Sequence, residues 1–85
     1  MNLNEKYNLN KRILLEKVDS NHIAIVKMLK SRIIRKDALK VLQLVENIKK
    51  VDESMKISLI STKNICSKSI ALLEENAVEI IYREL

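Results

Sequence analysis

The stretch that most constrains the fold of this chain is residues 21–48, NHIAIVKMLKSRIIRKDALKVLQLVENI. Residues 22–28 are rich in β-branched side chains, which favour a buried strand. Residues 30–36 are strongly basic. A helix is expected from Asp37, a candidate N-cap. Its apolar face, at helical spacing, consists of Ala38, Val41, Leu42, Val45 and Ile48. The stretch therefore predicts a strand, a basic segment and an amphipathic helix, in that order.

A β-hairpin is expected to lead into this stretch. Residues 11–18, KRILLEKV, alternate apolar and polar side chains as a half-buried strand does. The next three residues, Asp19, Ser20 and Asn21, favour tight turns through their own side chains. Residues 11–29 are thus predicted to form two antiparallel strands.

The second half of the chain predicts a strand, a helix and a strand. Residues 55–61 alternate as a strand, and residues 65–76 carry apolar side chains at helical spacing. Asn76 could end this helix in the left-handed conformation that Gly usually adopts. Residues 77–82 would form the last strand. The expected fold is a single α/β domain over residues 1–85, a β-hairpin followed by α-β-α-β on a small mixed sheet.

An all-α helical bundle is the alternative. The chain contains neither Gly nor Pro, so no strong helix breaker interrupts it. A long helix from about residue 62 to the end would also carry an apolar face, formed by Ile70, Leu73, Ala77, Ile80 and Ile81. Such a protein would act as a dimeric adaptor or interaction module. The β-branched content of the disputed segments favours the α/β fold.

Charge is distributed unevenly along the chain. Residues 1–50 hold 12 Lys and Arg against 5 Asp and Glu, whereas residues 51–85 hold 4 against 6. A basic half suits a partner that carries phosphate. The expected nucleic-acid contacts are Lys27, Lys30, Arg32, Arg35, Lys36 and Lys40. With two Tyr and no Phe or Trp, the composition argues against a platform for stacked bases, and hence against single-strand binding.

Other classes of protein are disfavoured by composition. Cys66 is the only cysteine and His22 the only histidine, so neither a disulfide framework nor a Cys or His metal site is expected. No apolar run approaches the ~20 residues that span a bilayer, and the first residues lack the apolar segment of a signal peptide. We expect a cytoplasmic protein with no membrane contact. A core this small would be stabilised by contact with a partner subunit, so a homodimer or another protein partner is expected.

Two stretches carry a resemblance to a known family. IAIVKMLKSRIIRKDALKVLQLVENI has the order of a strand, a short basic segment and a helix, and ISLISTKNICSKSIALLEENAVEIIY has that of a strand, a helix and a strand. Over about residues 11–82 this order resembles the PD-(D/E)XK, or restriction-endonuclease-like, nuclease superfamily. There the strand carries a Glu-x-Lys motif, and strand–helix–strand units end many domains, including Mrr-like restriction enzymes and Holliday-junction resolvases.

The resemblance assigns the family's active-site positions to residues of this chain, and the chain departs from the family at one of these positions. Lys30 falls at the family's catalytic lysine, and Met28 falls where the acidic metal ligand should stand. The family's upstream Asp would be Asp19 or, more loosely, Glu16. Mg²⁺ takes oxygen ligands, so the Met28 thioether cannot replace a carboxylate. The resemblance therefore implies a nuclease-like domain that is catalytically inactive, needs no cofactor, and binds nucleic acid or a protein partner through residues 27–40.

The alternative within the same family is a working metal-dependent nuclease. It would use Asp19, Glu16 and Lys30, with Mg²⁺ held by the two carboxylates to lower the pKa of an attacking water.

Overall fold

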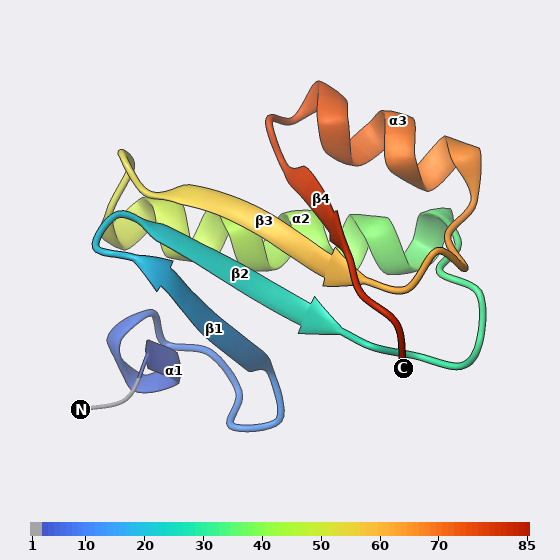
Figure 1. Cartoon of the computed structure of the whole chain (residues 1–85). Helices are drawn as coiled ribbons and strands as arrows, with labels where there is room; N and C mark the ends of the chain where they lie inside the picture. The colour runs from blue at the N-terminus through green and yellow to red at the C-terminus, as the bar shows by residue number, and fades with distance from the viewer. Residues whose placement is uncertain (1–2) are drawn as a thin grey trace.

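The computed structural model describes residues 3–85, and within them the chain forms three helices and four strands (Figure 1). In chain order they are α1 (Leu3–Lys6), β1 (Leu14–Asp19), β2 (His22–Lys27), α2 (Arg35–Val51), β3 (Lys56–Ser61), α3 (Ser67–Glu75) and β4 (Glu79–Tyr82). The predicted α/β class and the order of a hairpin followed by α-β-α-β are confirmed. The first predicted strand is shorter than expected, because residues 11–13 precede β1 as a turn.

The strands form one mixed sheet in the order β1-β2-β3-β4. β1 and β2 are antiparallel, whereas β2, β3 and β4 are parallel neighbours. Parallel strands need crossover connections, which α2 and α3 provide. The two helices contact each other, so they share one face of the sheet. The all-α alternative is wrong, because the alternating and β-branched segments find partners across the sheet.

The hairpin closes through the turn that the sequence predicts. The Asp19 carboxylate accepts a hydrogen bond from the Asn21 backbone N–H at 3.0 Å. Pairing then runs from Asp19 opposite His22 to Leu14 opposite Val26, with an irregularity at Val18. Short polar side chains that bond their own backbone are what allow such a tight reversal without Gly.

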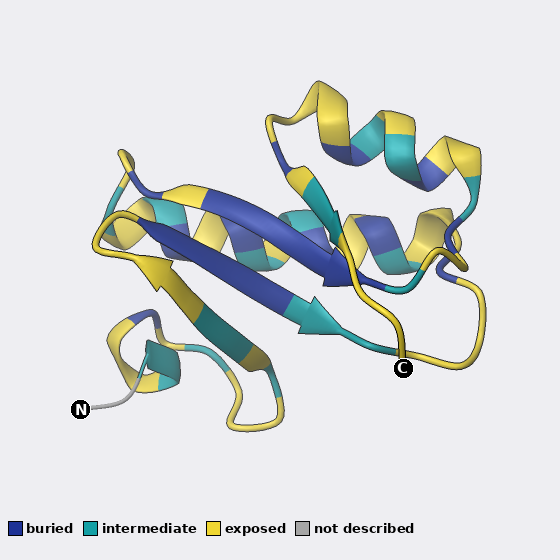
Figure 2. Cartoon of the chain, in the orientation of Figure 1, coloured by how far each residue is buried: buried dark blue, intermediate teal, exposed yellow. Residues whose placement is uncertain are grey.

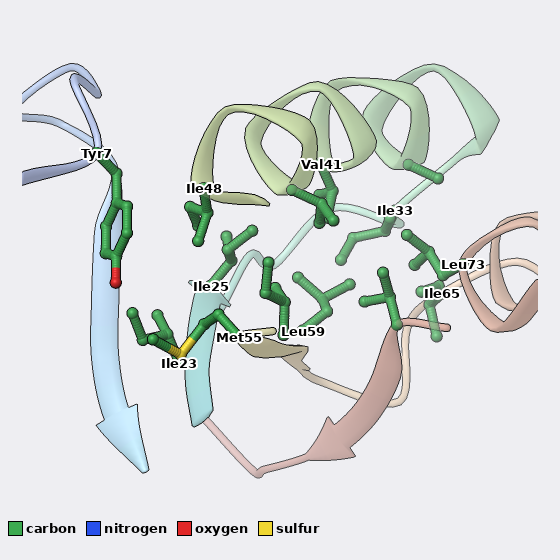
Figure 3. Packing of buried hydrophobic residues seen from close by; sticks show 14 residues of the cluster. Tyr7, Ile23, Ile25, Ile33, Val41, Ile48, Met55, Leu59, Ile65 and Leu73 are labelled. Carbon is green, nitrogen blue, oxygen red and sulfur yellow. The ribbon is translucent and has the colours of Figure 1, made fainter. Parts of the chain in front are cut away.

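The core lies between the two central strands and α2 (Figure 3). Ile23 and Ile25 of β2 and Ile57 and Leu59 of β3 are buried. From α2 the buried side chains are Ala38, Val41, Val45 and Ile48, and Leu42 is partly buried against them. The predicted helical face is therefore confirmed. Figure 2 shows the result: β2 and β3 are mostly buried, while the outer side of each helix is exposed.

The start of α2 differs from the prediction. The helix begins at Arg35, so its N-cap is Ile34 and not Asp37. Asp37 occupies the third helical position, where its Oδ2 accepts a hydrogen bond from the Ile34 backbone N–H at 3.1 Å. Asp37 thus supplies the reciprocal half of a capping box, the half that does not depend on the N-cap side chain. The helix consequently begins within the basic segment, and Arg35 lies in the first turn of α2.

The end of α3 also differs. Asn76 has φ −101° and the left-handed residue is Ala77, with φ 60°. The Ala77 N–H donates to the Glu74 carbonyl at 3.1 Å and the Val78 N–H to the Leu73 carbonyl at 2.9 Å, which fixes the reversal one residue later than expected. Asn76 instead donates through Nδ2 to the Leu72 carbonyl at 2.8 Å. An Ala in this conformation is strained, because its Cβ approaches the following carbonyl oxygen.

Replacing Ala77 with Gly is therefore expected to stabilise the protein by about 1 kcal/mol, since Gly adopts positive φ without a Cβ clash. Urea unfolding followed by circular dichroism measures the change. Ala71→Gly, on the exposed part of α3, is the matched control. It should destabilise by a similar amount. If Ala77→Gly were also destabilising, the strain at this position would be disproved.

Candidate nucleic-acid interface

The three parallel strands end at one edge of the sheet, and both long helices begin there. We call this the carboxyl edge: residues 28–34, residues 62–66 and the first turns of α2 and α3. Its two loops are joined by backbone hydrogen bonds, from the Ile33 N–H to the Asn64 carbonyl at 2.9 Å and from the Cys66 N–H to the Ile33 carbonyl at 3.0 Å. Asn64 Nδ2 also donates to the Lys30 carbonyl at 3.1 Å. The two loops therefore form one connected surface.

Most of the cations predicted to bind nucleic acid lie at this edge. Lys30 and Arg32 are exposed in the loop after β2, and Arg35 and Lys36 are exposed in the first turn of α2. Lys27 is half-buried at the end of β2. Lys40 is exposed one turn into α2. The basic segment, residues 30–36, therefore exposes its cations at this edge.

The edge also holds two cations that the sequence did not indicate. Lys63 is exposed in the loop after β3 and Lys68 in the first turn of α3. In the sequence each is isolated within a half that is acidic overall, so no local charge cluster marks it. The parallel pairing of β2 with β3 is what brings their loop beside the loop of Lys30 and Arg32.

The pKa of the Cys66 thiol, in the second loop, is lowered by neighbouring groups. The Cys66 sulfur is hydrogen-bonded to the Ser69 hydroxyl at 2.9 Å and accepts a hydrogen bond from the Ser69 backbone N–H at 3.4 Å. Both hydrogen bonds lower the pKa of this thiol. The positive charge of Arg32 lowers it further. Cys66 is the N-cap of α3.

The opposite edge of the sheet carries both acidic and basic side chains. There lie the hairpin turn, the turn before β3 and the end of α3, whose acidic residues are Asp19, Asp52, Glu53, Glu74, Glu75 and Glu79. The cations at this edge are Lys6, Lys17, Lys49, Lys50 and Lys56, and Lys56 is paired with Glu79 at 3.3 Å. The carboxyl edge is therefore the more strongly cationic of the two edges.

The three candidate catalytic residues are not brought together. Asp19 lies opposite His22 at the start of β2, whereas Lys30 lies beyond the end of that strand. The six residues of β2 alone separate them by roughly 20 Å. Met28, where the family has its acidic ligand, is half-buried just after β2. Within residues 3–85 there is no group of three or more His, Cys, Asp or Glu side chains that could hold a metal ion.

Glu16, the remaining candidate, is engaged in an ion pair. The Arg83 guanidinium donates from Nη1 to Glu16 Oε2 and from Nη2 to Oε1, each at 2.8 Å. Glu16 belongs to the first strand of the sheet and Arg83 follows the last, where its N–H donates to the Ser61 carbonyl at 2.8 Å. In Figure 1 the segment after β4 passes the end of β3 and finishes beside the loop that follows β2. The carboxylate is therefore held by a guanidinium and is not free to bind Mg²⁺.

His22 is also accounted for by a structural contact. Its Nε2 lies 2.6 Å from the Ser58 hydroxyl, and both residues are buried. A buried polar group needs such a partner, since leaving it unpaired costs about 1–3 kcal/mol.

The Glu16–Arg83 pair predicts a measurable titration. The bonded guanidinium holds the pKa of Glu16 below its ordinary value. The stabilisation that the pair provides is therefore complete above the unfolded-state pKa and disappears as the pH falls through the lowered folded-state pKa. In carbon-detected NMR titrations, Arg83→Gln should return the Glu16 pKa to its ordinary range. Lys56→Gln, which breaks the Lys56–Glu79 ion pair, should leave the Glu16 pKa unchanged. A Glu16 pKa insensitive to Arg83→Gln would contradict the bonded geometry.

Comparisons with known proteins identify no relative of this chain. No family model matches the chain, and no similar curated protein or solved structure was found. No helix within residues 3–85 is long and apolar enough to cross a membrane. What is established is a small α/β fold with a four-stranded mixed sheet and a cationic carboxyl edge.

Proposed function

We propose that this protein binds the phosphate backbone of a nucleic acid through the carboxyl edge of its sheet, without cleaving it. The observation that carries the proposal is the gathering there of exposed cations from separate segments of the chain: Lys30, Arg32, Arg35, Lys36, Lys63 and Lys68. The ion pairs found among residues 3–85 are Lys56–Glu79 and Glu16–Arg83, so none of these six cations is neutralised by one.

The chemistry of the edge suits phosphate. Arg32 and Arg35 can each donate two parallel hydrogen bonds to a phosphate, while the lysines act as point charges. The nearest acid in the first turn of α2 is Asp37, which already accepts from the Ile34 N–H. Contacts of this kind give an affinity that falls steeply with salt and depends little on base sequence.

We also propose that the fold is restriction-endonuclease-like with a degenerate site. The order of a hairpin followed by α-β-α-β supports this kinship. The separation of Asp19 from Lys30, and the engagement of Glu16 by Arg83, support a binding role over catalysis. A dimer, a protein partner and a cytoplasmic location stay predictions of the sequence.

Fluorescence anisotropy with labelled oligonucleotides, over a range of salt concentrations, tests the binding proposal. The double variant Lys30→Ala/Arg32→Ala should weaken binding and reduce the slope of log K against log salt by about 1 for each phosphate contact removed. The matched control is Lys49→Ala/Lys50→Ala, which removes the same charge from the other end of α2. It should leave the slope nearly unchanged.

Two results would contradict the proposal. Equal losses in both double variants would mean that only net charge matters. Absence of binding at low salt would remove the nucleic-acid role and leave a protein partner as the candidate for this edge.

The metal-dependent nuclease alternative has its own test. Supercoiled plasmid incubated with the protein and Mg²⁺ or Mn²⁺ is expected to stay intact, because Asp19 and Lys30 lie beyond opposite ends of β2 and Glu16 is bonded to Arg83. Cleavage that occurs with the wild-type protein and is lost in Lys30→Ala would contradict this expectation.

A further inference from the structure

A groove opens at the carboxyl edge, between the loop after β2, the loop after β3 and the segment after β4. Its volume is about 440 Å³, within the ≈ 300–1,000 Å³ typical of small-ligand pockets. The residues of the two loops that line it are Leu29, Lys30, Thr62, Lys63 and Asn64; Tyr82 and the residues after it form the remaining wall. In parallel sheets, ligands bind outside the carboxyl ends of the strands, where this groove lies.

The lining combines apolar surface with cations. Tyr82 is 46% exposed, and Leu29 and Leu85 are 38% and 73% exposed. Lys30 and Lys63 flank this surface from the two hydrogen-bonded loops. Glu84 is the acidic member of the lining, while Arg83 is held by Glu16. An exposed aromatic ring between two lysines is the combination used by proteins that bind unpaired nucleotides.

Two polar groups of the lining keep hydrogen-bonding capacity. Asn64 uses its Nδ2 on the Lys30 carbonyl, which leaves Oδ1 as an acceptor. The Thr62 hydroxyl oxygen accepts from the Asn64 N–H at 3.2 Å, which leaves its O–H as a donor. A base entering the groove would meet one acceptor and one donor at its edge.

We infer that this groove receives the base of an unpaired nucleotide, stacked on Tyr82, with Lys30 and Lys63 at the flanking phosphates. The inference rests on the proposed function and refines it, because it makes single-stranded nucleic acid the preferred ligand. Bases within a duplex are already stacked and cannot reach the ring. The low aromatic content of the sequence argues against an extended platform for stacked bases. The site inferred here needs only one exposed tyrosine beside two lysines.

Binding to four oligonucleotides of equal length tests the inference. They are a single-stranded DNA, the RNA of the same sequence, the DNA duplex and an abasic single strand that keeps the phosphates but lacks bases. The wild-type protein should bind the DNA or RNA single strand about tenfold more tightly than the abasic strand. Comparison of DNA with RNA shows whether the 2′-hydroxyl contributes. Tyr82→Leu should abolish the preference over the abasic strand, and Tyr82→Phe should keep it.

A second measurement does not depend on changing Tyr82. The chain has two tyrosines and no tryptophan, and Tyr7 is buried with a hydroxyl that has no hydrogen-bond partner. Tyr7→Phe should therefore preserve the core and leave Tyr82 as the only tyrosine fluorophore. Its emission should be quenched by the single strand and not by the abasic strand.

The outcomes separate the two proposals. Equal affinity for the ordinary and abasic strands, without quenching, overturns the groove and leaves phosphate binding at the edge intact. Tighter binding of the duplex than of the single strand also overturns it. Failure to bind any of the four oligonucleotides overturns both proposals.

Discussion

Parallel pairing of β2 with β3 is the interaction on which the rest of this structure depends. It aligns Ile23 with Ile57 and Ile25 with Leu59, so that two strands present one apolar surface to α2. The pairing continues past the strands as a bridge between Ile33 and Ile65, which joins the two loops of the carboxyl edge. One set of backbone hydrogen bonds thus orders both the core and the candidate interface.

The same pairing determines where the charges lie. Both parallel strands end at one edge, so their loops and the helices that follow collect cations from distant parts of the chain. Lys63 joins Lys30 for this reason, although 33 positions separate them in the sequence. The acidic turns lie at the other edge. Lysines lie there as well, so a partner with negative charge would be attracted most strongly, but not exclusively, to the carboxyl edge.

The proposed kinship with restriction-endonuclease-like nucleases rests on the order of elements and not on a working site. A nuclease of that kind needs carboxylates that converge on a metal ion. Here Asp19 closes the hairpin turn, Glu16 holds Arg83, and Met28 provides no oxygen ligand. Each candidate residue has a structural contact or the wrong chemistry, whereas the surrounding cations are exposed. This contrast favours binding over hydrolysis.

The sequence by itself determined the α/β class, the hairpin turn and the apolar face of α2, because alternation, turn residues and helical spacing are local signals. The tertiary structure decided the rest. It made Ile34 the N-cap of α2, placed the left-handed residue at Ala77, kept Asp19 away from Lys30, and set Tyr82 beside Lys30 and Lys63. The separation of Asp19 from Lys30 and the position of Tyr82 depend on which strands pair and in which direction. That choice follows from contacts between residues far apart in the chain, and no local pattern encodes it.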